Sequence, residues 1–177
     1  FSSEADIYVV HTCTVTGSGD SDSRKAVRRA RRCNPDATVV ATGCYAQRRP
    51  NELDEAGADL VIGNGQKGQL IAMLESHLQG ETVADFVPSK RPRTAQFLSI
   101  DGAVAQGRTR GTLQIQDGCD EHCTYCIIPT VRGHSASRNP ADVIAQARQM
   151  VDAGYRELAL TGVHTGSYGY DFDERDA

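Results

Sequence analysis

The sequence predicts an α/β protein whose N-terminal unit is a parallel, three-layer arrangement of strands and helices. Over the first 80 residues, three short β-branched runs alternate with polar helical stretches, and each run ends close to a glycine or a cysteine. Strands and helices in alternation, joined by short glycine-marked turns, are typical of a parallel sheet covered on both faces. A second unit with the same alternation begins at Thr112.

Each element of the N-terminal unit has a local signal. We expect the strands at the apolar runs 7–10, 38–42 and 59–62. We expect a charged helix over 21–33 with Ser and Asp as candidate caps, a helix over 46–56 with Pro50 in its first turn, and a helix over 67–77. The three strand–helix pairs account for the whole of this unit.

The second unit is separated from the first by a stretch of different composition. Residues 81–111 are rich in Pro, Arg and Gln, and we interpret them as a linker or hairpin. After them we expect a strand over 112–116, a cysteine-rich loop, a helix over 140–153 and a strand over 157–161. The tail, 168–177, is polar and shows no closing element.

Composition excludes several classes of protein. The 177 residues carry a net charge of -4, with 39% hydrophobic and 24% charged residues, which is ordinary for a globular chain. The apolar runs are far shorter than the roughly 20 residues that span a bilayer, and the N-terminus lacks the features of a signal peptide. The six cysteines are too sparse for a secreted disulfide scaffold. We therefore expect a cytoplasmic protein with reduced thiols.

Three of the cysteines form a compact motif. Cys119, Cys123 and Cys126 have the spacing Cys-x3-Cys-x2-Cys in a loop that follows a predicted strand. Three thiolates so close in sequence can each bind a different iron of a cubane cluster, which leaves the fourth iron open to a small molecule. A parallel fold places such ligands at the carboxyl ends of its strands. An open iron–sulfur cluster is the leading interpretation.

Other interpretations of the motif stay open. His122 or His134 could complete a zinc site with three cysteines, although structural zinc sites more often use two separated ligand pairs. Cys123 and Cys126 could form a thioredoxin-like redox pair, which leaves Cys119 unexplained. Chance clustering of core cysteines is the third alternative.

The motif strings resemble those of radical S-adenosylmethionine (SAM) enzymes, and within them the methylthiotransferase branch. The resemblance covers nearly the whole chain and is closest to the enzymes that methylthiolate threonylcarbamoyladenosine in tRNA. One departure is His11, where the family usually has Asn. The matching strings are IQDGCDEHCTYCIIP at 115–129, RG at 132–133, SR at 137–138, TCTVT at 12–16, ATGCYAQ at 41–47 and LVIG at 60–63.

The resemblance implies a fold for each part. Residues 1–80 are expected to be part of a flavodoxin- or Rossmann-like methylthiotransferase domain, 81–111 a linker, and 112–177 the first βα units of a radical SAM core, a TIM-like partial barrel. The chain begins at Phe1, close to a strand, and the family has a further cysteine ligand upstream of this point. We therefore expect an internal slice of a longer enzyme.

The resemblance also implies roles for residues. Cys119, Cys123 and Cys126 are the expected ligands of a 4Fe-4S cluster whose open iron binds SAM. Tyr125 is expected near the SAM adenine, and Gly162 would let the amino group of SAM approach the backbone. A packing aromatic and a turn glycine are equally good explanations of those two residues.

The N-terminal cysteines match the ligands of a second cluster in the family. Cys13 and Cys44 are the expected ligands of this auxiliary 4Fe-4S cluster, and both follow predicted parallel strands. The alternative is that they are small buried residues at strand ends. Cys33 has no counterpart in the motif and is expected to be an ordinary residue.

The activity implied is transfer of a methylthio group to C2 of N6-threonylcarbamoyladenosine at position 37 of tRNA. The partners implied are tRNA and a one-electron donor such as flavodoxin or ferredoxin, with no membrane. Alternatives are a methylthiotransferase acting on isopentenyladenosine-37 of tRNA or on a ribosomal protein, and a non-catalytic zinc-stabilised binding module.

The basic residues give no independent sign of RNA binding. Positions 24, 28, 31 and 32 of the helix expected over 21–33 form a basic stripe that could face phosphates, but a solvated helix face explains such a run more often. A second basic set lies in the expected linker and comprises Lys90, Arg91, Arg93, Arg108 and Arg110.

Overall fold

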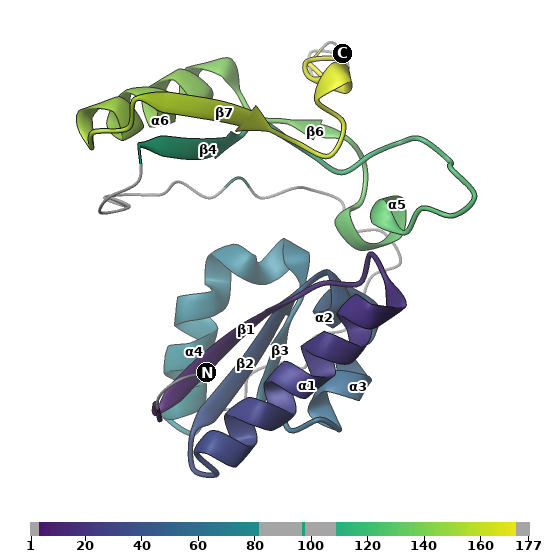
Figure 1. Ribbon diagram of the computed structural model, residues 1–177, viewed down its shortest axis with the longest axis vertical. Coiled ribbons are helices and arrows are strands. Elements are labelled where there is room, and N and C mark those ends of the chain that lie inside the picture. Colours follow the sequence, from purple (N-terminus) through teal and green to yellow (C-terminus); the bar gives the residue numbers. More distant parts are fainter. Residues whose placement is uncertain (1–3, 82–96, 98–108, 173–177) are drawn as a thin grey trace.

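The computed structural model describes residues 4–81, 97 and 109–172. Most of the expected linker, with Lys90, Arg91, Arg93 and Arg108, lies outside the described residues, as does the end of the tail. The described chain is mixed α/β with two parallel sheets, which confirms the predicted fold class (Figure 1). One sheet has three strands, the other has two, and a short antiparallel pair adjoins the second.

The N-terminal sheet has the strand order β1 (Ile7–Thr12), β2 (Thr38–Gly43) and β3 (Leu60–Ile62). Successive side chains of a strand point to opposite faces, and β2 is buried on both of them. Val39 and Ala41 belong to one apolar core, whereas Val40 belongs to another. The sheet is therefore the middle of three layers, as predicted.

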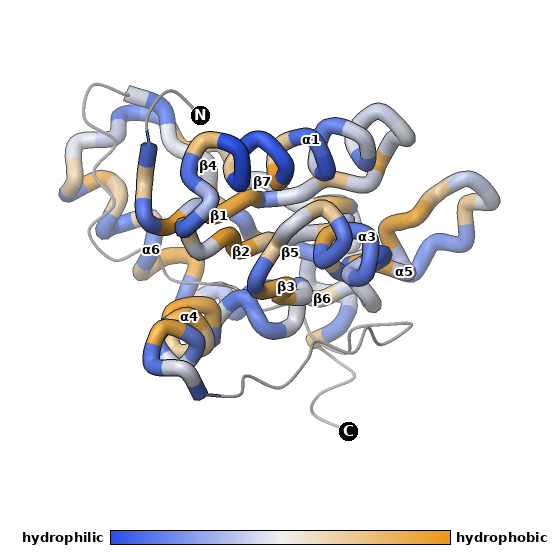
Figure 2. Tube along the Cα trace, turned by 90° about the horizontal axis from the view of Figure 1, so that it is seen from below, coloured by the Kyte–Doolittle hydropathy of each residue, from blue (hydrophilic) through white to orange (hydrophobic). Residues whose placement is uncertain are grey.

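Helices from four segments cover the two faces. Helix α1 (Gly17–Cys33), helix α2 (Cys44–Arg48) and helix α3 (Pro50–Asp54) contribute to the core that contains Val39. Helix α4 (Leu70–Leu78) packs on the opposite face through Leu74. Figure 2 shows the apolar strands in the interior and the hydrophilic outer side of α1.

Helix α1 begins four residues before the predicted start. Thr16 is its N-cap and accepts a hydrogen bond from the backbone N–H of Gly19 at 3.1 Å, so the prediction of a cap near residue 21 is wrong. Two glycines with low helix propensity, Gly17 and Gly19, hid the first turn from sequence reasoning. The earlier start brings the helix close to the end of β1.

The helix predicted over 46–56 is in fact two short helices. Arg49 separates α2 from α3 with φ -140°, and Pro50 is the first residue of α3. A proline lacks the N–H that would continue a helix, and it disfavours helical geometry in the residue before it. The helix predicted over 67–77 likewise begins as the 3₁₀ segment η1 (Asn64–Gln69) before α4.

The second sheet pairs β4 (Arg110–Gln114) with β7 (Glu157–Thr161) in parallel. Helix α6 (Pro140–Asp152) packs against β4 so closely that a Cβ on Gly111 would lie 2.3 Å from the Met150 methyl group. The strand predicted over 112–116 in fact runs from Arg110 to Gln114 and is followed by β5 (Gln116–Asp117), so Arg110 and Gly111 belong to a strand and not to the predicted linker. Arg110, expected among the basic residues of the linker, pairs with Glu157 of β7 at 3.2 Å.

Two short elements of this unit escaped prediction. Strand β6 (Ala136–Ser137) pairs antiparallel with β5, and helix α5 (Ile128–Arg132) follows the cysteine loop. Neither is long enough to show a periodic pattern. A 3₁₀ turn, η2 (Thr165–Ser167), follows β7. Of the helices in the described ranges, none combines the length and apolar character needed to cross a membrane.

Candidate metal centre

The two N-terminal cysteines lie at neighbouring strand ends. Cys13 follows β1 and Cys44 follows β2, and the parallel register pairs Thr12 with Gly43, the residues immediately before them. Both therefore sit at the carboxyl edge of the sheet, where α/β proteins bind ligands. Cys33 ends α1, which returns to the amino edge before β2 begins. The structure thus brings Cys13 and Cys44 to one edge and leaves Cys33 at the other.

A glycine that tolerates no side chain precedes a cysteine in each unit. Gly43, before Cys44, has φ 110°, and a Cβ there would lie 2.4 Å from the carbonyl oxygen of Thr12. Gly118, before Cys119, has φ 71°, and a Cβ there would lie 1.9 Å from the carbonyl oxygen of His134. Only glycine combines this backbone geometry with such close approach. Both cysteines therefore follow sharply constrained turns.

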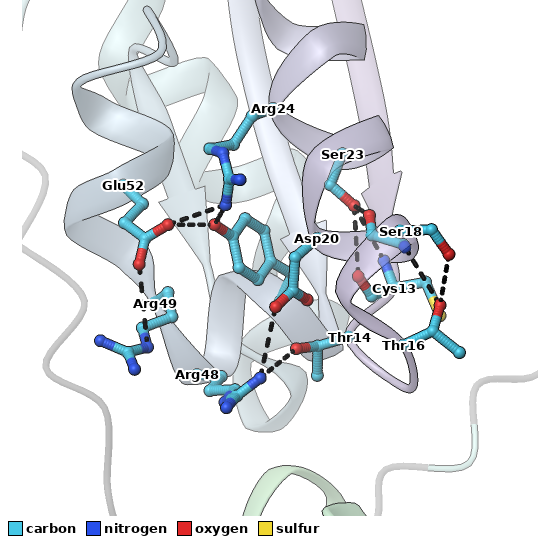
Figure 3. Close-up of polar contacts among 12 residues, drawn as sticks. Cys13, Thr14, Thr16, Ser18, Asp20, Ser23, Arg24, Arg48, Arg49 and Glu52 are labelled. Atoms are coloured by element: carbon cyan, nitrogen blue, oxygen red, sulfur yellow. Dashed lines mark hydrogen bonds and ion pairs between the residues drawn. The ribbon is translucent and has the colours of Figure 1, made fainter.

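The loop that carries Cys13 is held against α1 (Figure 3). The Ser23 hydroxyl lies 3.2 Å from the Cys13 nitrogen and 3.3 Å from its carbonyl oxygen, so it can bond the backbone on both sides of the residue. The Arg48 guanidinium donates to Thr14 at 3.1 Å and pairs with Asp20 at 3.3 Å. The Cys13 side chain remains exposed. This loop thus presents a free thiol from a fixed backbone.

Two of the four basic positions noted on α1 form ion pairs within the N-terminal unit. Arg24 pairs with Glu52 at 2.8 Å (Figure 3). The Tyr45 hydroxyl contacts both side chains. Arg31 pairs with Asp59 at 2.6 Å and also donates to backbone carbonyls. The hydrogen bond from Tyr45, followed by the charge of Arg24, lowers the pKa of Glu52. These two arginines therefore tie α1 to neighbouring elements instead of facing solvent.

Cys44, in contrast to Cys13, is buried among polar groups. Its side chain is 5% exposed, and the side-chain nitrogen Nδ2 of Asn64 lies 3.7 Å from its sulfur. The same nitrogen donates at 2.8 Å to the carbonyl oxygen of Val131 in α5. Helix α5 packs against α2, so residues from the second unit reach this cysteine (Figure 1).

Lys67 and Arg132 interact electrostatically with Cys44, and His11 interacts with both of these cations. Burial lowers the pKa of Lys67, and burial followed by the charges of Lys67 and Arg132 lowers the pKa of His11. Burial opposes ionisation of Arg132, but hydrogen bonds and charges from Asp117 and Cys44 more than offset it and raise its pKa. The imidazole of His11, at the family's usual asparagine position, lies 3.3 Å from the Lys67 ammonium.

The three clustered cysteines lie on an accessible loop. Residues 118–127 form neither helix nor strand, Cys123 is exposed, and Cys119 and Cys126 are partly exposed. The backbone is anchored by the Cys119 N–H, which donates to the Gly133 carbonyl at 3.1 Å, and by the Cys126 N–H, which donates to the Cys123 carbonyl at 3.0 Å. Tyr125 projects from this loop and is 91% exposed.

The thiols of the cysteine loop are close in sequence but are not gathered into one ligand group. Within the described ranges no three Cys, His, Asp or Glu side chains lie closely enough to hold an ion. His134, a candidate zinc ligand, pairs through Nδ1 with Asp120 at 2.5 Å. Thiolates are the ligands that iron–sulfur clusters take, so the chemistry of the three cysteines fits such a cluster.

Comparisons with known proteins match both units. Residues 1–63 match the model of uncharacterized protein family UPF0004, and residues 113–176 match that of the radical SAM superfamily. These matches, in this order, make the chain similar to radical SAM methylthiotransferases. The family uses SAM and 4Fe-4S clusters.

Individual relatives agree with that similarity. The chain is 43% identical to the threonylcarbamoyladenosine tRNA methylthiotransferase MtaB of Bacillus subtilis and 39% identical to that of Aquifex aeolicus, over 98% and 97% of its own length. It is 32% identical to the ribosomal protein uS12 methylthiotransferase RimO of Desulforudis audaxviator, over 97% of its length. The chain spans only 39%, 42% and 39% of these relatives.

Within the methylthiotransferase motif, sequence reasoning missed the part played by Gln116. Its side chain is fully buried, and its amide nitrogen donates to the Gly118 carbonyl at 2.9 Å and to the Ser135 hydroxyl at 3.1 Å. Its amide oxygen accepts from the His164 N–H at 2.8 Å. Gln116 thus joins the start of the cysteine loop to the segment after β7. The strand expected over 112–116 alternates polar and apolar residues, so no local signal distinguished the buried Gln116 from the exposed Gln114.

The side chain of Gln116 explains in part why residue 162 is a glycine. A Cβ at Gly162 would lie 3.0 Å from Gln116 Cβ and Oε1 and 3.0 Å from a methyl group of Thr165. Such contacts are tighter than most side chains allow, so packing favours glycine here independently of any ligand. The turn-glycine explanation therefore has direct geometric support.

Proposed function

We propose that the chain is part of a methylthiotransferase that adds a methylthio group to C2 of N6-threonylcarbamoyladenosine at position 37 of tRNA. Two relatives named for that reaction, 43% and 39% identical, support the substrate. The observation that carries the chemistry is the presence of two cysteine sets, one at the carboxyl edge of each parallel unit. In this proposal 1–80 is methylthiotransferase domain, 81–111 linker and 112–177 the start of the radical SAM core.

Each cysteine set has a separate task in the proposal. Cys119, Cys123 and Cys126 hold a 4Fe-4S cluster with one open iron, and Cys13 and Cys44 hold the auxiliary cluster. When bound, the first cluster supplies the electron that cleaves SAM. The exposure of Cys123 leaves room for SAM to reach the iron.

Other residues position SAM. Tyr125, exposed on the loop, is proposed to lie against the adenine of SAM. Gly162 lies at the end of β7, where its backbone is proposed to meet the amino group of SAM. Gln116 holds this strand end and the cysteine loop at a fixed separation through its hydrogen bonds on both sides.

The partners proposed are a tRNA substrate and a one-electron donor such as flavodoxin or ferredoxin. Arg28 and Arg32 of α1 are exposed and form no ion pair with the described residues, so we propose them as candidates for contact with tRNA phosphates. A cytoplasmic location, where tRNA and such donors are found, is part of the same proposal.

Anaerobic reconstitution tests the cluster assignment. We expect the protein expressed from its complete gene to bind iron and sulfide and to give an EPR signal that changes on addition of SAM. Cys119→Ala should abolish the SAM-dependent change, whereas Cys33→Ala, at the far end of α1, should leave it intact. Zinc in place of iron, or a SAM-dependent signal that survives Cys119→Ala, would contradict the proposal.

The substrate is tested by analysing modified nucleosides. In a strain that lacks the gene, the methylthio form of threonylcarbamoyladenosine should disappear from tRNA while threonylcarbamoyladenosine itself accumulates. The RimO relative at 32% identity makes a ribosomal protein the second candidate. Loss of a methylthio group from a ribosomal protein, or from isopentenyladenosine in tRNA, would replace the proposed substrate with that one.

A further inference from the structure

The surroundings of Cys44 are unusual for a buried thiol. Its 5% exposure would suit an ordinary apolar core residue, yet the groups directed at it come from η1 and α5 and are polar. Polar groups are buried at a cost unless each has a partner. Whether these neighbours donate or accept hydrogen bonds therefore indicates whether the site accommodates a neutral thiol or an anionic sulfur.

The orientation of the Asn64 amide is determined by a second contact. The carbonyl oxygen of Val131 can only accept a hydrogen bond, so the group 2.8 Å from it must be the amide nitrogen of Asn64. The same nitrogen lies 3.7 Å from the Cys44 sulfur and thus offers it the other N–H. Asn64 Oδ1 is buried without a hydrogen-bond partner in the described part of the chain. Asn64 therefore faces Cys44 as a donor.

The other neighbours are cations. Arg132 follows Val131, is oriented by its ion pair with Asp117 at 2.9 Å, and is close enough for its charge to interact with Cys44. Lys67 is also close enough for its charge to interact with Cys44. A neutral S–H facing an amide donor and two cations would be poorly matched, whereas an anionic sulfur accepts the hydrogen bond from the amide and is attracted by both charges.

We propose that Asn64 and Arg132 are positioning residues that stabilise Cys44 as an anionic, iron-bound sulfur. Helix α5 then links the two units directly, because Arg132 and the Val131 carbonyl come from the segment that follows the clustered cysteines. Hydrogen bonds to ligand sulfurs raise the reduction potential of a cluster because they favour its more negative, reduced state. This inference rests on the proposed role of Cys44 as a cluster ligand.

The test isolates the second cluster by removing the first. The protein is expressed from its complete gene with Cys119, Cys123 and Cys126 all changed to Ala, so that the remaining iron belongs to the auxiliary site. In that background the midpoint potential of the cluster is measured by redox titration with EPR. The same titration is repeated after adding Arg132→Gln, and separately after adding Asn64→Ala.

We expect Arg132→Gln to lower the midpoint potential. Residues that hydrogen-bond to metal ligands typically have effects of about tenfold or more. A tenfold change in the relative stability of the two oxidation states of the cluster corresponds to about 59 mV for one electron. Arg132→Lys, which keeps the charge but loses the planar fork, should lie between wild type and Gln. Asn64→Ala should shift the potential in the same direction by less.

Arg31→Gln is the matched control. Arg31 lies in the last turn of α1, at the opposite edge of the sheet from Cys44, forms an ion pair with Asp59, and has 29% side-chain exposure against 31% for Arg132. It should leave the potential unchanged. A potential that is the same in Arg132→Gln and Arg31→Gln would overturn the inference. If Arg132→Gln unfolds the protein, the comparison of Asn64→Ala with Arg31→Gln decides by the same criterion.

The design separates this inference from the function on which it rests. If Cys44→Ala leaves the iron content of the triple variant unchanged, Cys44 is not a ligand and the proposed auxiliary site is wrong. If Cys44→Ala removes the iron but Arg132→Gln and Asn64→Ala leave the potential unchanged, the auxiliary site stands and only the donor role fails.

Discussion

The two cysteine sites differ in how much of the fold surrounds them. Cys44 lies at the end of a strand that is buried on both faces, and it faces the amide of Asn64 from η1 and the charge of Arg132 from α5. Cys123 lies on an exposed loop beside a two-stranded sheet in which Leu160 is 58% exposed. A buried, donor-rich site suits a ligand that must hold a cluster in one state, and an accessible loop suits a site that a small molecule must enter.

The largest expected effect would disrupt the constrained turn before Cys44. Gly43→Ala places a Cβ 2.4 Å from the Thr12 carbonyl at φ 110°. Backbone strain and overpacking, each about 1–3 kcal/mol, should together lower the free energy of unfolding by about 2–6 kcal/mol. Gly154→Ala is the control, since Gly154 has φ 97° with open space around it and should show strain alone. Denaturant unfolding measures both, and equal losses would contradict the clash.

The second largest effect should be the loss of unfolding free energy when a core leucine is truncated, and this loss should differ between the two units. Leu53, in α3, is fully buried in the N-terminal core, and Leu53→Ala should cost about 2–5 kcal/mol of unfolding free energy. Leu160, in β7, is 58% exposed, and Leu160→Ala should change stability by about 0.5 kcal/mol or less. A comparable loss at Leu160 would show that the second sheet is more completely covered than its exposure indicates.

Gln116 allows a test within the accessible site. Gln116→Ala leaves the His164 N–H and the Gly118 carbonyl without their partner, and we expect a cost of about 1–3 kcal/mol. Amide hydrogen exchange should accelerate at His164 and in the cysteine loop while β2 stays protected. Uniform acceleration across both sheets would mean that Gln116 supports the whole fold instead of the site.

The smallest effect concerns the acid stability of the N-terminal unit. The Tyr45 hydrogen bond and the charge of Arg24 lower the pKa of Glu52 from its ordinary 4.5, so their stabilisation is present above that pH and is lost as pH falls through the folded pKa. Tyr45→Phe should raise the pKa of Glu52 and flatten the pH dependence of unfolding below about pH 5. NMR titration of the Glu52 carboxyl measures the shift, and an unchanged pKa would contradict the assignment.

Much of the N-terminal unit could be predicted because its signals are local. The β-branched runs at 7–10 and 38–42 correspond to β1 and β2. In the second unit, the strand predicted over 157–161 matches β7 at both ends. Errors arose where a local signal was misleading or too short. The glycines before residue 21 concealed the first turn of α1, the proline at position 50 divided a helix, and α5 has only five residues.

Sequence alone determined the chemistry that this chain can carry. The thiols, the spacing of Cys119, Cys123 and Cys126 and the order of the two cysteine sets are properties of the chain, whereas Cys13 and Cys44 meet at one sheet edge only through the pairing of β1 with β2. The structure alone decided which residues surround those thiols. Asn64, Arg132 and Cys44 are far apart in sequence and converge only because α5 packs against α2, and Arg24 and Arg31 are directed inward by carboxylates on other elements. Hydrogen bonds and ion pairs between distant segments depend on packing, and no local pattern encodes them.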